Sequence, residues 1–273
     1  DMYRFYLVLG NSGTGRTSLL EHSGIHFPRR FPSAADLAKQ TQHFSQWWFS
    51  TQAVVGLFPE WYAGRQPDWP AHFEYADFPL YDGVSDELSD EVETFLADGP
   101  PPIVFTPGSG SYFVARFIEA AADACRRLGR RGMILSNFGD TPAALPAGVR
   151  RFRYVPLGPL LKRAAGLVHH GGIGTMARAL RAGIPHVVTP MAYDQPDNAV
   201  RLARMGVARW VPAHAVSGRR LAAALDDVLH SPAVAAACRR YAAMMPSEPI
   251  TRLNWHPWIF RTHSRNWLLQ IGR

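Results

Sequence analysis

A histidine, several glycines and a threonine stand together in the middle of the chain, where they could bind an anion. The segment His169-His170-Gly171-Gly172-Ile173-Gly174-Thr175 follows the apolar residues 164–168, whose composition predicts a short buried strand. The residues from Thr175 to Ala182 have helical composition, and Gly183 suits a C-terminal cap. A glycine turn between a strand and a helix offers free N–H groups and the positive end of the helix dipole. We therefore predict a phosphate site in which His170 adds a donor, and Thr175 caps the helix and donates its hydroxyl.

A second polar group comes after the next apolar segment, residues 184–188. Asp194 and Gln195 stand there side by side, ahead of a predicted helix. In an open α/β sheet, ligands bind at the carboxyl ends of the strands, and an acid beside an amide suits vicinal hydroxyls. Asp197 and Asn198 are explained equally well by capping of that helix. A phosphate site followed by a hydroxyl-binding pair predicts a sugar nucleotide as the ligand.

The rest of the chain from residue 83 alternates apolar strands with helices. This alternation predicts an α/β fold with a parallel, doubly wound, Rossmann-like sheet. The predicted strands, besides the two above, are 103–106, 132–136, 149–155 and 207–211, and the predicted helices are 85–96, 112–128, 196–205, 217–230 and 232–245.

The run from His169 to Asn198 closely resembles the donor-binding signature of nucleotide-sugar-dependent glycosyltransferases of the GT-B fold. It is similar to the bacterial UDP-glucuronosyl, glucosyl and rhamnosyl transferase-like enzymes, mainly in their C-terminal, donor-binding half. The resemblance implies contacts to the donor diphosphate from the turn at His170 and contacts to the sugar hydroxyls from the acid–amide pair. The residues matched to the diphosphate and the sugar are His170, Gly171, Gly172, Gly174, Thr175, Asp194 and Gln195.

Two further matches lie outside the main signature. Ser109, in the turn Pro107-Gly108-Ser109-Gly110-Ser111, corresponds to a glycine–serine turn that approaches the diphosphate in this family. Tyr154 falls where the family has an aromatic ring stacked on the donor base, and the backbone at Val155 falls where the pyrimidine edge is read. A plain strand–helix turn and a core tyrosine are the alternatives for Ser109 and Tyr154.

The resemblance also implies a division of the chain into three parts. Residues 1–82 correspond to a much reduced N-terminal acceptor domain and the interdomain linker, residues 83–245 to the donor domain, and 246–273 to a C-terminal tail. In this family a loop matched by Gly10, Ser12 and Gly13 continues into an Asp or His that acts as general base. Thr14-Gly15-Arg16 stands there instead, so the expected base is absent and the catalytic residue is unknown.

Two other kinds of site are less well supported by the sequence. Gly10, Gly15, Arg16 and Thr17 fit a P-loop with arginine in the lysine position, but arginine does not replace that lysine and no second nucleotide motif follows. A metal site at His169 and His170 lacks a third ligand at suitable spacing, and adjacent residues of a strand point to opposite sides. We therefore expect His169 to be a packing or hydrogen-bonding residue, and no metal.

Composition sets broader limits. The chain has 273 residues and a net charge of +7, which suits an anionic ligand, a membrane surface or dispersed solvated arginines. No nucleic-acid-binding module is recognisable. Two cysteines make no disulfide framework, and no apolar run approaches the roughly 18 residues that span a bilayer. We expect a cytoplasmic protein, free or peripheral at the membrane.

These observations lead to two expectations of function. The first is an inverting, metal-independent glycosyltransferase that moves a hexosyl group from a UDP- or dTDP-sugar to a hydroxyl of a small-molecule or lipid acceptor, with no cofactor. The second is a donor-binding module, or half-enzyme, that is inactive without a second chain supplying the acceptor domain. A P-loop nucleotide hydrolase is a distant third.

Overall fold

The computed structural model describes most of residues 83–246 and part of the N-terminal region. The described residues are 7–8, 54–67, 69, 71, 73–78, 80, 87–108, 114–137 and 145–246. The predictions for Ser109, for the Gly10–Thr17 loop and for most of the C-terminal tail lie outside these residues.

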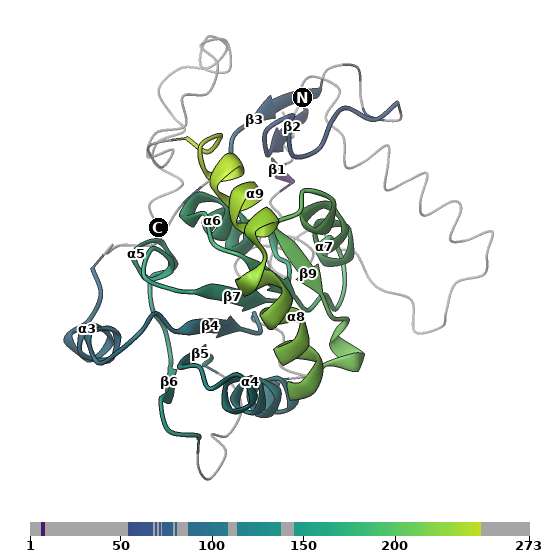
Figure 1. Ribbon diagram of the computed structural model, residues 1–273. Helices are drawn as coiled ribbons and strands as arrows, with labels where there is room; N and C mark the ends of the chain where they lie inside the picture. Colours follow the sequence, from purple (N-terminus) through teal and green to yellow (C-terminus); the bar gives the residue numbers. More distant parts are fainter. Residues whose placement is uncertain are drawn as a thin grey trace, which may run out of the picture.

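The larger part of the molecule is built on a six-stranded, fully parallel sheet with the strand order β6-β5-β4-β7-β8-β9 (Figure 1). This arrangement confirms the predicted α/β, doubly wound sheet. The order corresponds to the 3-2-1-4-5-6 arrangement of dinucleotide-binding folds, with β4 as the first strand. The strands are β4 (Ile103–Thr106), β5 (Gly132–Leu135), β6 (Val149–Phe152), β7 (Gly166–His169), β8 (His186–Val188) and β9 (Ala208–Trp210).

Helices cover both faces of this sheet, and the strand sequences show why. Ile103 and Phe105 of β4 pack into one buried cluster with residues of α4 and α8, whereas Val104 packs into another cluster with residues of α3 and α5. Successive side chains of a strand point to opposite faces, so an uninterrupted apolar strand is buried on both sides. The helices are α3 (Asp90–Ala97), α4 (Val114–Leu128), α5 (Leu157–Leu161), α6 (Ile173–Ala182), α7 (Gln195–Arg204), α8 (Gly218–His230) and α9 (Pro232–Ala242), with a short 3-10 helix η2 (Ala213–Ala215).

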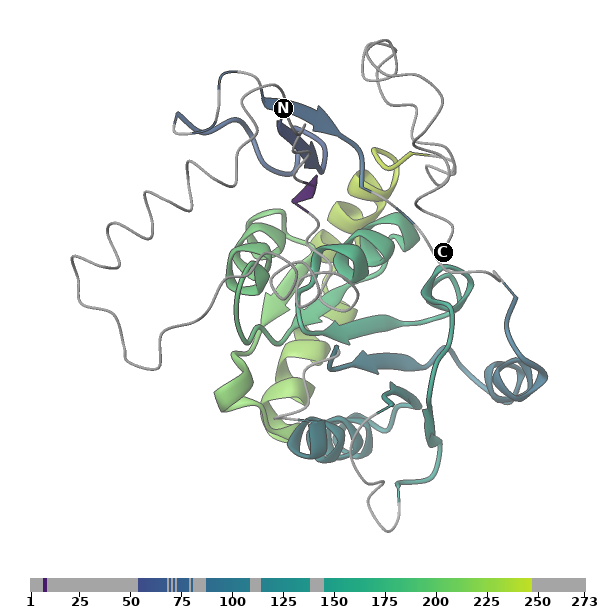
Figure 2. The same ribbon diagram turned by 180° about the vertical axis from the view of Figure 1, so that it is seen from behind.

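Helices α4 and α8 lie side by side on one face of the sheet, as both views show (Figures 1 and 2). On the other face, α5 packs against α6, which connects β7 to β8. The helix α6 ends as predicted, at Gly183 in a left-handed conformation with φ of 67°.

Among the described helices, α3 and α5 differ most from the sequence-based predictions. The predicted helix 85–96 begins at Asp90, because Ser89 has extended backbone angles and takes the N-cap position. The helix α5 was not predicted, since its five residues, Leu-Gly-Pro-Leu-Leu, are too few to show a helical period.

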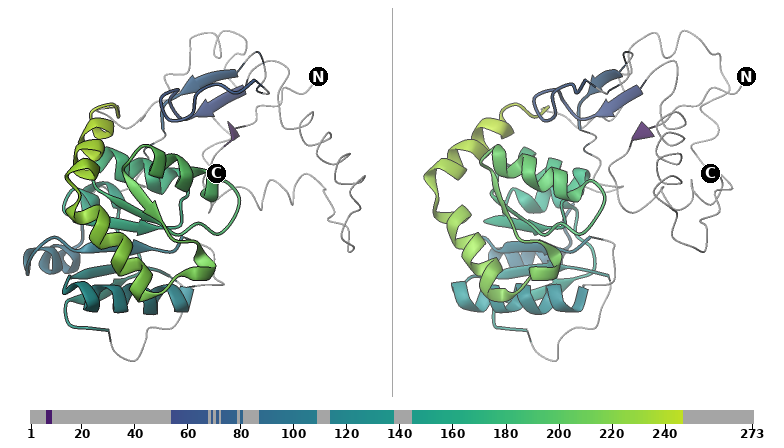
Figure 3. Two further views of the ribbon diagram at one scale, coloured as in Figure 1. Left: turned by 45° about the vertical axis from the view of Figure 1, so that its right-hand side comes forward. Right: turned by 90° about the vertical axis from the view of Figure 1, so that its right-hand side faces the viewer.

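A second, three-stranded parallel sheet is formed by β1 (Leu7–Val8), β2 (Val54–Leu57) and β3 (Phe73–Ala76), in the order β1-β2-β3. It lies at the end of the molecule away from α4 (Figure 3). The residues that follow β2 and β3 are rich in aromatic rings, and Phe58, Trp69 and Phe73 pack edge to face or tilted against one another.

The N-terminal region shares the core of the larger part. Tyr62, Phe78 and Leu80 are buried in the same cluster as α4, α6 and α8, and the ring of Trp61 lies 5.5 Å from that of Tyr241. Burial of these apolar groups fixes the region after β2 on the donor half. The three-part division of the chain at residues 82 and 245 stays a prediction.

No single helix among the described residues has the length and apolar character of a membrane span. Helices α8 and α9 reach them only together, and they are bent by 73° against each other.

Candidate functional site

The strand order creates a switch point between β4 and β7, where the chain turns from one half of the sheet to the other. In open α/β sheets, ligands bind in the crevice outside the carboxyl ends of the two strands at such a point. Here β4 ends at Thr106 and continues into Pro107 and Gly108, and β7 ends at His169 and continues into His170. The fold therefore brings Gly108 and the histidine–glycine turn to one place.

The imidazole of His170 is enclosed between two glycines at this point. Its side chain is buried, with 6% of the residue exposed. A Cβ on Gly108 would lie 2.8 Å from the His170 ring, and a Cβ on Gly172 would collide with its Nε2. Both positions thus require glycine because the ring occupies the space of a side chain. Gly108 is the first glycine of the matched turn, and its contact with His170 could not be read from the sequence.

The His170 side chain is neutral at physiological pH. Burial lowers its pKa to about 4, and the nearby carboxylate of Asp194 opposes this shift only in part. A neutral imidazole serves an anion as a hydrogen-bond donor rather than as a positive charge. The influence of Asp194 also shows that the two sequence-predicted polar groups lie close together in space.

The helix after this turn begins two residues earlier than predicted. Gly172 is the N-cap residue of α6 and Ile173 its first residue, so Thr175 lies in the first turn and does not cap the helix. The predicted capping role of Thr175 was wrong because a glycine without a side chain takes that position. No acceptor within the described residues takes up the backbone N–H groups of Gly172, Ile173 and Gly174. They are left to bind an anion together with the positive end of the helix dipole.

Gly171 has a backbone conformation that only glycine adopts readily, with φ of +95°. A Cβ there would also lie 2.9 Å from Cγ1 of Val188 and 3.2 Å from the carbonyl oxygen of Gln195. Its N–H donates to Nδ1 of His169 at 3.1 Å. The turn is therefore fixed on one side by a side chain of the strand that leads into it.

His169 and His186 form a buried pair beneath this turn. Because Nδ1 of His169 accepts from Gly171, its Nε2 carries the proton and donates to Nδ1 of His186 at 3.3 Å. Burial lowers the pKa of His169 well below its usual value and that of His186 to about 3, so both are neutral. This geometry confirms the prediction that His169 is a packing and hydrogen-bonding residue.

The second polar group forms the β8–α7 loop, residues 189–194, and the start of α7. Gln195 is buried, and its Oε1 accepts from the backbone N–H groups of Met191 at 2.9 Å and Ala192 at 3.3 Å. The amide oxygen is thus occupied by the loop, and the amide nitrogen is the group that remains to donate to a sugar hydroxyl. Asp194 takes the N-cap position of α7 but makes no capping hydrogen bond with its side chain.

Asn198 connects the two polar groups, a role that the sequence did not reveal. Its Nδ2 donates to the carbonyl oxygen of Gly171 at 2.8 Å and to Oδ2 of Asp194 at 3.1 Å. Its Oδ1 accepts from the hydroxyl of Tyr62 at 2.5 Å. One buried amide therefore holds the histidine–glycine turn, Asp194 and the N-terminal region together.

Tyr154 and Val155 follow β6, at the same carboxyl edge of the sheet. Tyr154 is 69% exposed, so the alternative of a core tyrosine is wrong. Val155 buries its side chain in the cluster with Leu160 and Leu161, which leaves its backbone as the part available to a ligand. Ser109, the remaining predicted residue, lies outside the described residues.

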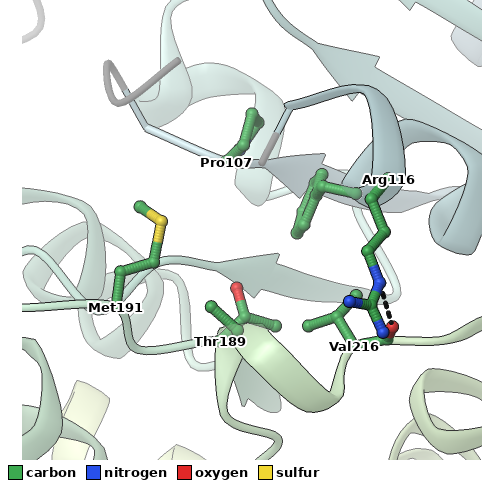
Figure 4. Close-up of a pocket in the computed structure, with 7 residues that line it drawn as sticks. Pro107, Arg116, Thr189, Met191 and Val216 are labelled. Carbon is green, nitrogen blue, oxygen red and sulfur yellow. Dashed lines mark hydrogen bonds between the residues drawn. The ribbon is translucent and has the colours of Figure 1, made fainter. Parts of the chain in front are cut away.

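A small pocket opens beside the two loops on the α4 side of the sheet (Figure 4). It is bordered by Pro107 of the first turn and by Met191 of the second loop, and Nε of Arg116 donates to the carbonyl oxygen of Val216 at 3.1 Å. Neither His170 nor Asp194 lines it, so this pocket lies beside the histidine–glycine turn and is not formed by it.

Metal-binding side chains do not cluster in the part of the chain that the structure describes. No group of three or more His, Cys, Asp or Glu side chains that could hold a metal ion occurs there.

Comparisons with known proteins give the same picture. Residues 133–252 match the family model of the erythromycin biosynthesis protein CIII-like, C-terminal domain. Among curated proteins, the O-mycaminosyltylonolide 6-deoxyallosyltransferase of Streptomyces fradiae is 37% identical over 185 residues. This alignment covers 66% of the chain and 43% of that relative, so the chain spans less than half of the relative's length.

Solved structures share the fold. The spinosyn forosaminyltransferase SpnP superimposes with a TM-score of 0.64 and 23% identity, over 94% of this chain and 68% of that one. The glycosyltransferase VinC in complex with DTDP gives a TM-score of 0.59 and 21% identity, over 78% of this chain and 55% of that one. Residues 133–252 thus match an EryCIII-like C-terminal domain, and the chain is similar to the GT-B nucleotide-sugar glycosyltransferases, mainly to their C-terminal half.

Proposed function

We propose that this chain, as a relative of the GT-B glycosyltransferases, binds a UDP- or dTDP-sugar and transfers its hexosyl group to an acceptor hydroxyl, with inversion and without a metal ion. The observation that carries the proposal is the meeting of His170 with Gly108 at the switch point, in front of the uncapped N-terminus of α6. A diphosphate placed there would meet the backbone N–H groups of Gly172, Ile173 and Gly174 and the imidazole of His170. The relative from Streptomyces fradiae, which is named as a deoxyallosyltransferase, supports sugar transfer as the reaction class.

The chemistry of transfer explains why donors at this place matter. When the acceptor hydroxyl attacks the anomeric carbon, the bond to the diphosphate breaks and negative charge develops on the leaving group. The N–H groups of Gly172, Ile173 and Gly174 and the dipole of α6 stabilise that charge, and they are oriented before the reaction begins. His170 adds one hydrogen bond from a neutral ring, since its pKa of about 4 keeps it uncharged. These groups supply the stabilisation for which other enzymes use a metal ion.

The sugar end of the donor is assigned to Asp194 and to Nε2 of Gln195. An acceptor and a donor so close together match the two kinds of hydrogen bond that vicinal hydroxyls make. Both belong to a loop fixed by its own hydrogen bonds, which orients the hexose at small entropic cost. The exposed ring of Tyr154 is assigned to the nucleobase, and VinC, in complex with DTDP, makes a thymine nucleotide a suitable first ligand. The acceptor is a small molecule or a lipid.

Calorimetry with UDP, dTDP, UDP-glucose and dTDP-rhamnose tests the proposal. We expect at least one nucleotide sugar to bind, and His170→Ala to weaken its binding by about 1.5–3 kcal/mol, the scale of a hydrogen bond to a charged group. His230→Ala is the matched control, because His230 is an exposed histidine at the end of α8. Equal affinity of His170→Ala and the unchanged chain would overturn the role of His170.

A second function, a donor-binding module that needs a partner chain, is favoured by one sequence feature. Thr14-Gly15-Arg16 stands where relatives of this family place a general base. Transfer assays with and without a chelator, and with and without an added acceptor-domain chain, separate the two functions. Transfer by this chain alone supports the enzyme, whereas donor binding without transfer, rescued by the second chain, supports the module.

A further inference from the structure

Tyr193 has an unusual backbone for its residue type. Among the described residues it is the only one other than glycine with a positive φ, at 61°. The left-handed region is unfavourable for a residue with a Cβ, and bulky side chains rarely adopt it. Such strain persists where the surroundings enforce it, and it is concentrated at ligand sites.

The Tyr193 side chain is also unusually exposed, with 82% of the residue accessible to solvent. The loop that carries it is held from both sides. Gln195 accepts from the N–H groups of Met191 and Ala192 through its side chain, and its own N–H donates to the carbonyl oxygen of Ala192 at 3.2 Å. The strained backbone therefore presents an aromatic ring outward from a fixed position.

The neighbours of Tyr193 point to the sugar end of the donor. The next residue, Asp194, receives a hydrogen bond from Asn198, which also binds the carbonyl oxygen of Gly171 in the phosphate turn. Tyr193, Asp194 and the phosphate turn thus form one connected unit. The backbone that carries the ring is therefore linked to the turn that is proposed to bind the diphosphate.

We propose that the ring of Tyr193 stacks against the C–H face of the donor hexose and so contributes to recognition of the sugar. This assignment rests on the proposed function and goes beyond it, because it names an apolar contact where the sequence indicated only polar ones. The hydroxyls of glucose lie around the rim of the ring, so the faces of the ring present axial C–H groups, and an aromatic face packs well against them. Asp194 and Gln195 would then hold the hydroxyls while Tyr193 holds the ring.

The test compares each nucleotide sugar with its parent nucleotide in calorimetry, UDP-glucose with UDP and dTDP-rhamnose with dTDP. Tyr193→Gly is expected to weaken the nucleotide sugar about three- to tenfold, within the range of ring stacking, and to leave the nucleotide unchanged. Tyr193→Phe keeps the ring and is expected to bind the nucleotide sugar within twofold of the unchanged chain. Tyr154→Ala is the matched comparison, since loss of a base-stacking ring weakens the nucleotide and the nucleotide sugar alike.

Thermal unfolding separates a ligand contact from a structural role. Because glycine takes the positive φ without strain, Tyr193→Gly is expected to melt at the same temperature as the unchanged chain or higher. A lower melting temperature with equal loss of nucleotide and nucleotide sugar would show a structural residue and overturn the assignment. Equal binding of the nucleotide sugar by Tyr193→Gly, or a loss in Tyr193→Phe as large as in Tyr193→Gly, would overturn it as well. If none of the four ligands bound the unchanged chain, the proposed function would fail first and the Tyr193 assignment with it.

Discussion

Two loops at the carboxyl edge of the sheet differ in whether their polar groups are hydrogen-bonded within the loop. The β7–α6 turn, residues 170–172, leaves backbone N–H groups without an acceptor among the described residues and encloses a neutral histidine. The β8–α7 loop turns its polar groups on itself, since the side chain of Gln195 binds two N–H groups of the loop. The first loop thus offers donors to an anion, and the second fixes the positions of a few groups.

Under the proposed function, the difference follows from what each loop binds. A diphosphate has several charged oxygens, and a cluster of N–H donors at a helix N-terminus binds it well. A hexose is neutral, so its recognition depends on the exact placement of single hydrogen bonds and ring contacts. The strained Tyr193 belongs to the loop that is held internally, where the hydrogen bonds around it can sustain the strain.

Acid should destabilise the protein more than any single substitution, because three buried histidines lie in and beneath the first loop. The pKa values of His170 and His186, about 4 and about 3, lie below the usual 6.5, and that of His169 is also lowered. The unfolded chain therefore takes up protons first as the pH falls below about 6.5, and stability is lost. Between pH 7 and pH 5 each histidine should lower the free energy of unfolding by about 2 kcal/mol.

Urea denaturation at pH 7, 6 and 5 measures this loss. His170→Gln, which removes one of the three titrating groups, should show a shallower dependence on pH. The same denaturation midpoint at pH 5 and pH 7 would contradict neutral, buried histidines in the native protein.

Gly171→Ala should break the link between the two loops. The added Cβ meets Val188 and the backbone of Gln195, and alanine disfavours the φ of +95°. We expect the free energy of unfolding to fall by about 2–4 kcal/mol, together with loss of UDP binding. Gly129→Ala is the control, because Gly129 also has a positive φ but nothing lies within 4 Å of its added Cβ. If Gly171→Ala and Gly129→Ala lost the same amount of unfolding free energy, the contact of residue 171 with Gln195 would contribute nothing to stability.

Changes at Gln195 should separate the loop-fixing role from sugar binding. Gln195→Ala removes the acceptor of two backbone N–H groups and should lower the free energy of unfolding by about 1–2 kcal/mol. Gln195→Glu keeps an acceptor oxygen but lacks the amide donor, so it should retain stability and lose affinity for UDP-glucose relative to UDP. Denaturation and calorimetry report the two properties. If Gln195→Glu bound UDP-glucose like the unchanged chain, Nε2 would have no part in sugar binding.

Tyr62→Phe, at the junction of the N-terminal region with the two loops, should have the smallest effect on ligand binding. It removes the donor to Oδ1 of Asn198 and leaves that oxygen buried without its partner, at a cost of about 1–2 kcal/mol in unfolding free energy. UDP affinity should change little, because the bonds of Asn198 to Gly171 and Asp194 remain. Tyr241→Phe, which also removes a tyrosine hydroxyl, is the control. A large fall in UDP affinity for Tyr62→Phe would mean that the N-terminal region sets the geometry of the phosphate turn.

The regular elements of the donor half were predicted well from the sequence. The strand β4 was predicted with its observed bounds, Ile103–Thr106, because three apolar residues and a threonine stand between prolines and a glycine turn. The start of α6 was predicted two residues late, since Gly172 and Gly174 have low helix propensity and the sequence does not show that Gly172 is the N-cap. The helix α5 was missed because it is too short for a period to appear.

The candidate site was predicted in its residues but not in its internal contacts. His170, Asp194 and Gln195 were identified from their types and spacing, and the structure brings them to one edge of the sheet. Their roles toward a donor stay predictions. The enclosure of His170 by Gly108, the three hydrogen bonds of Asn198 and the φ of Tyr193 had no signal in the sequence.

The sequence by itself determined the order of strands and helices and the presence of a glycine turn behind a histidine, because apolar periodicity and glycine content are local properties of the chain. Only the tertiary structure decided that Gly108 meets His170, that His169 pairs with His186, and that Asn198 joins Gly171 to Tyr62. These contacts join residues far apart in the chain. They arise when parallel strands and their helices pack around a shared core, and no local pattern records which side chains then meet.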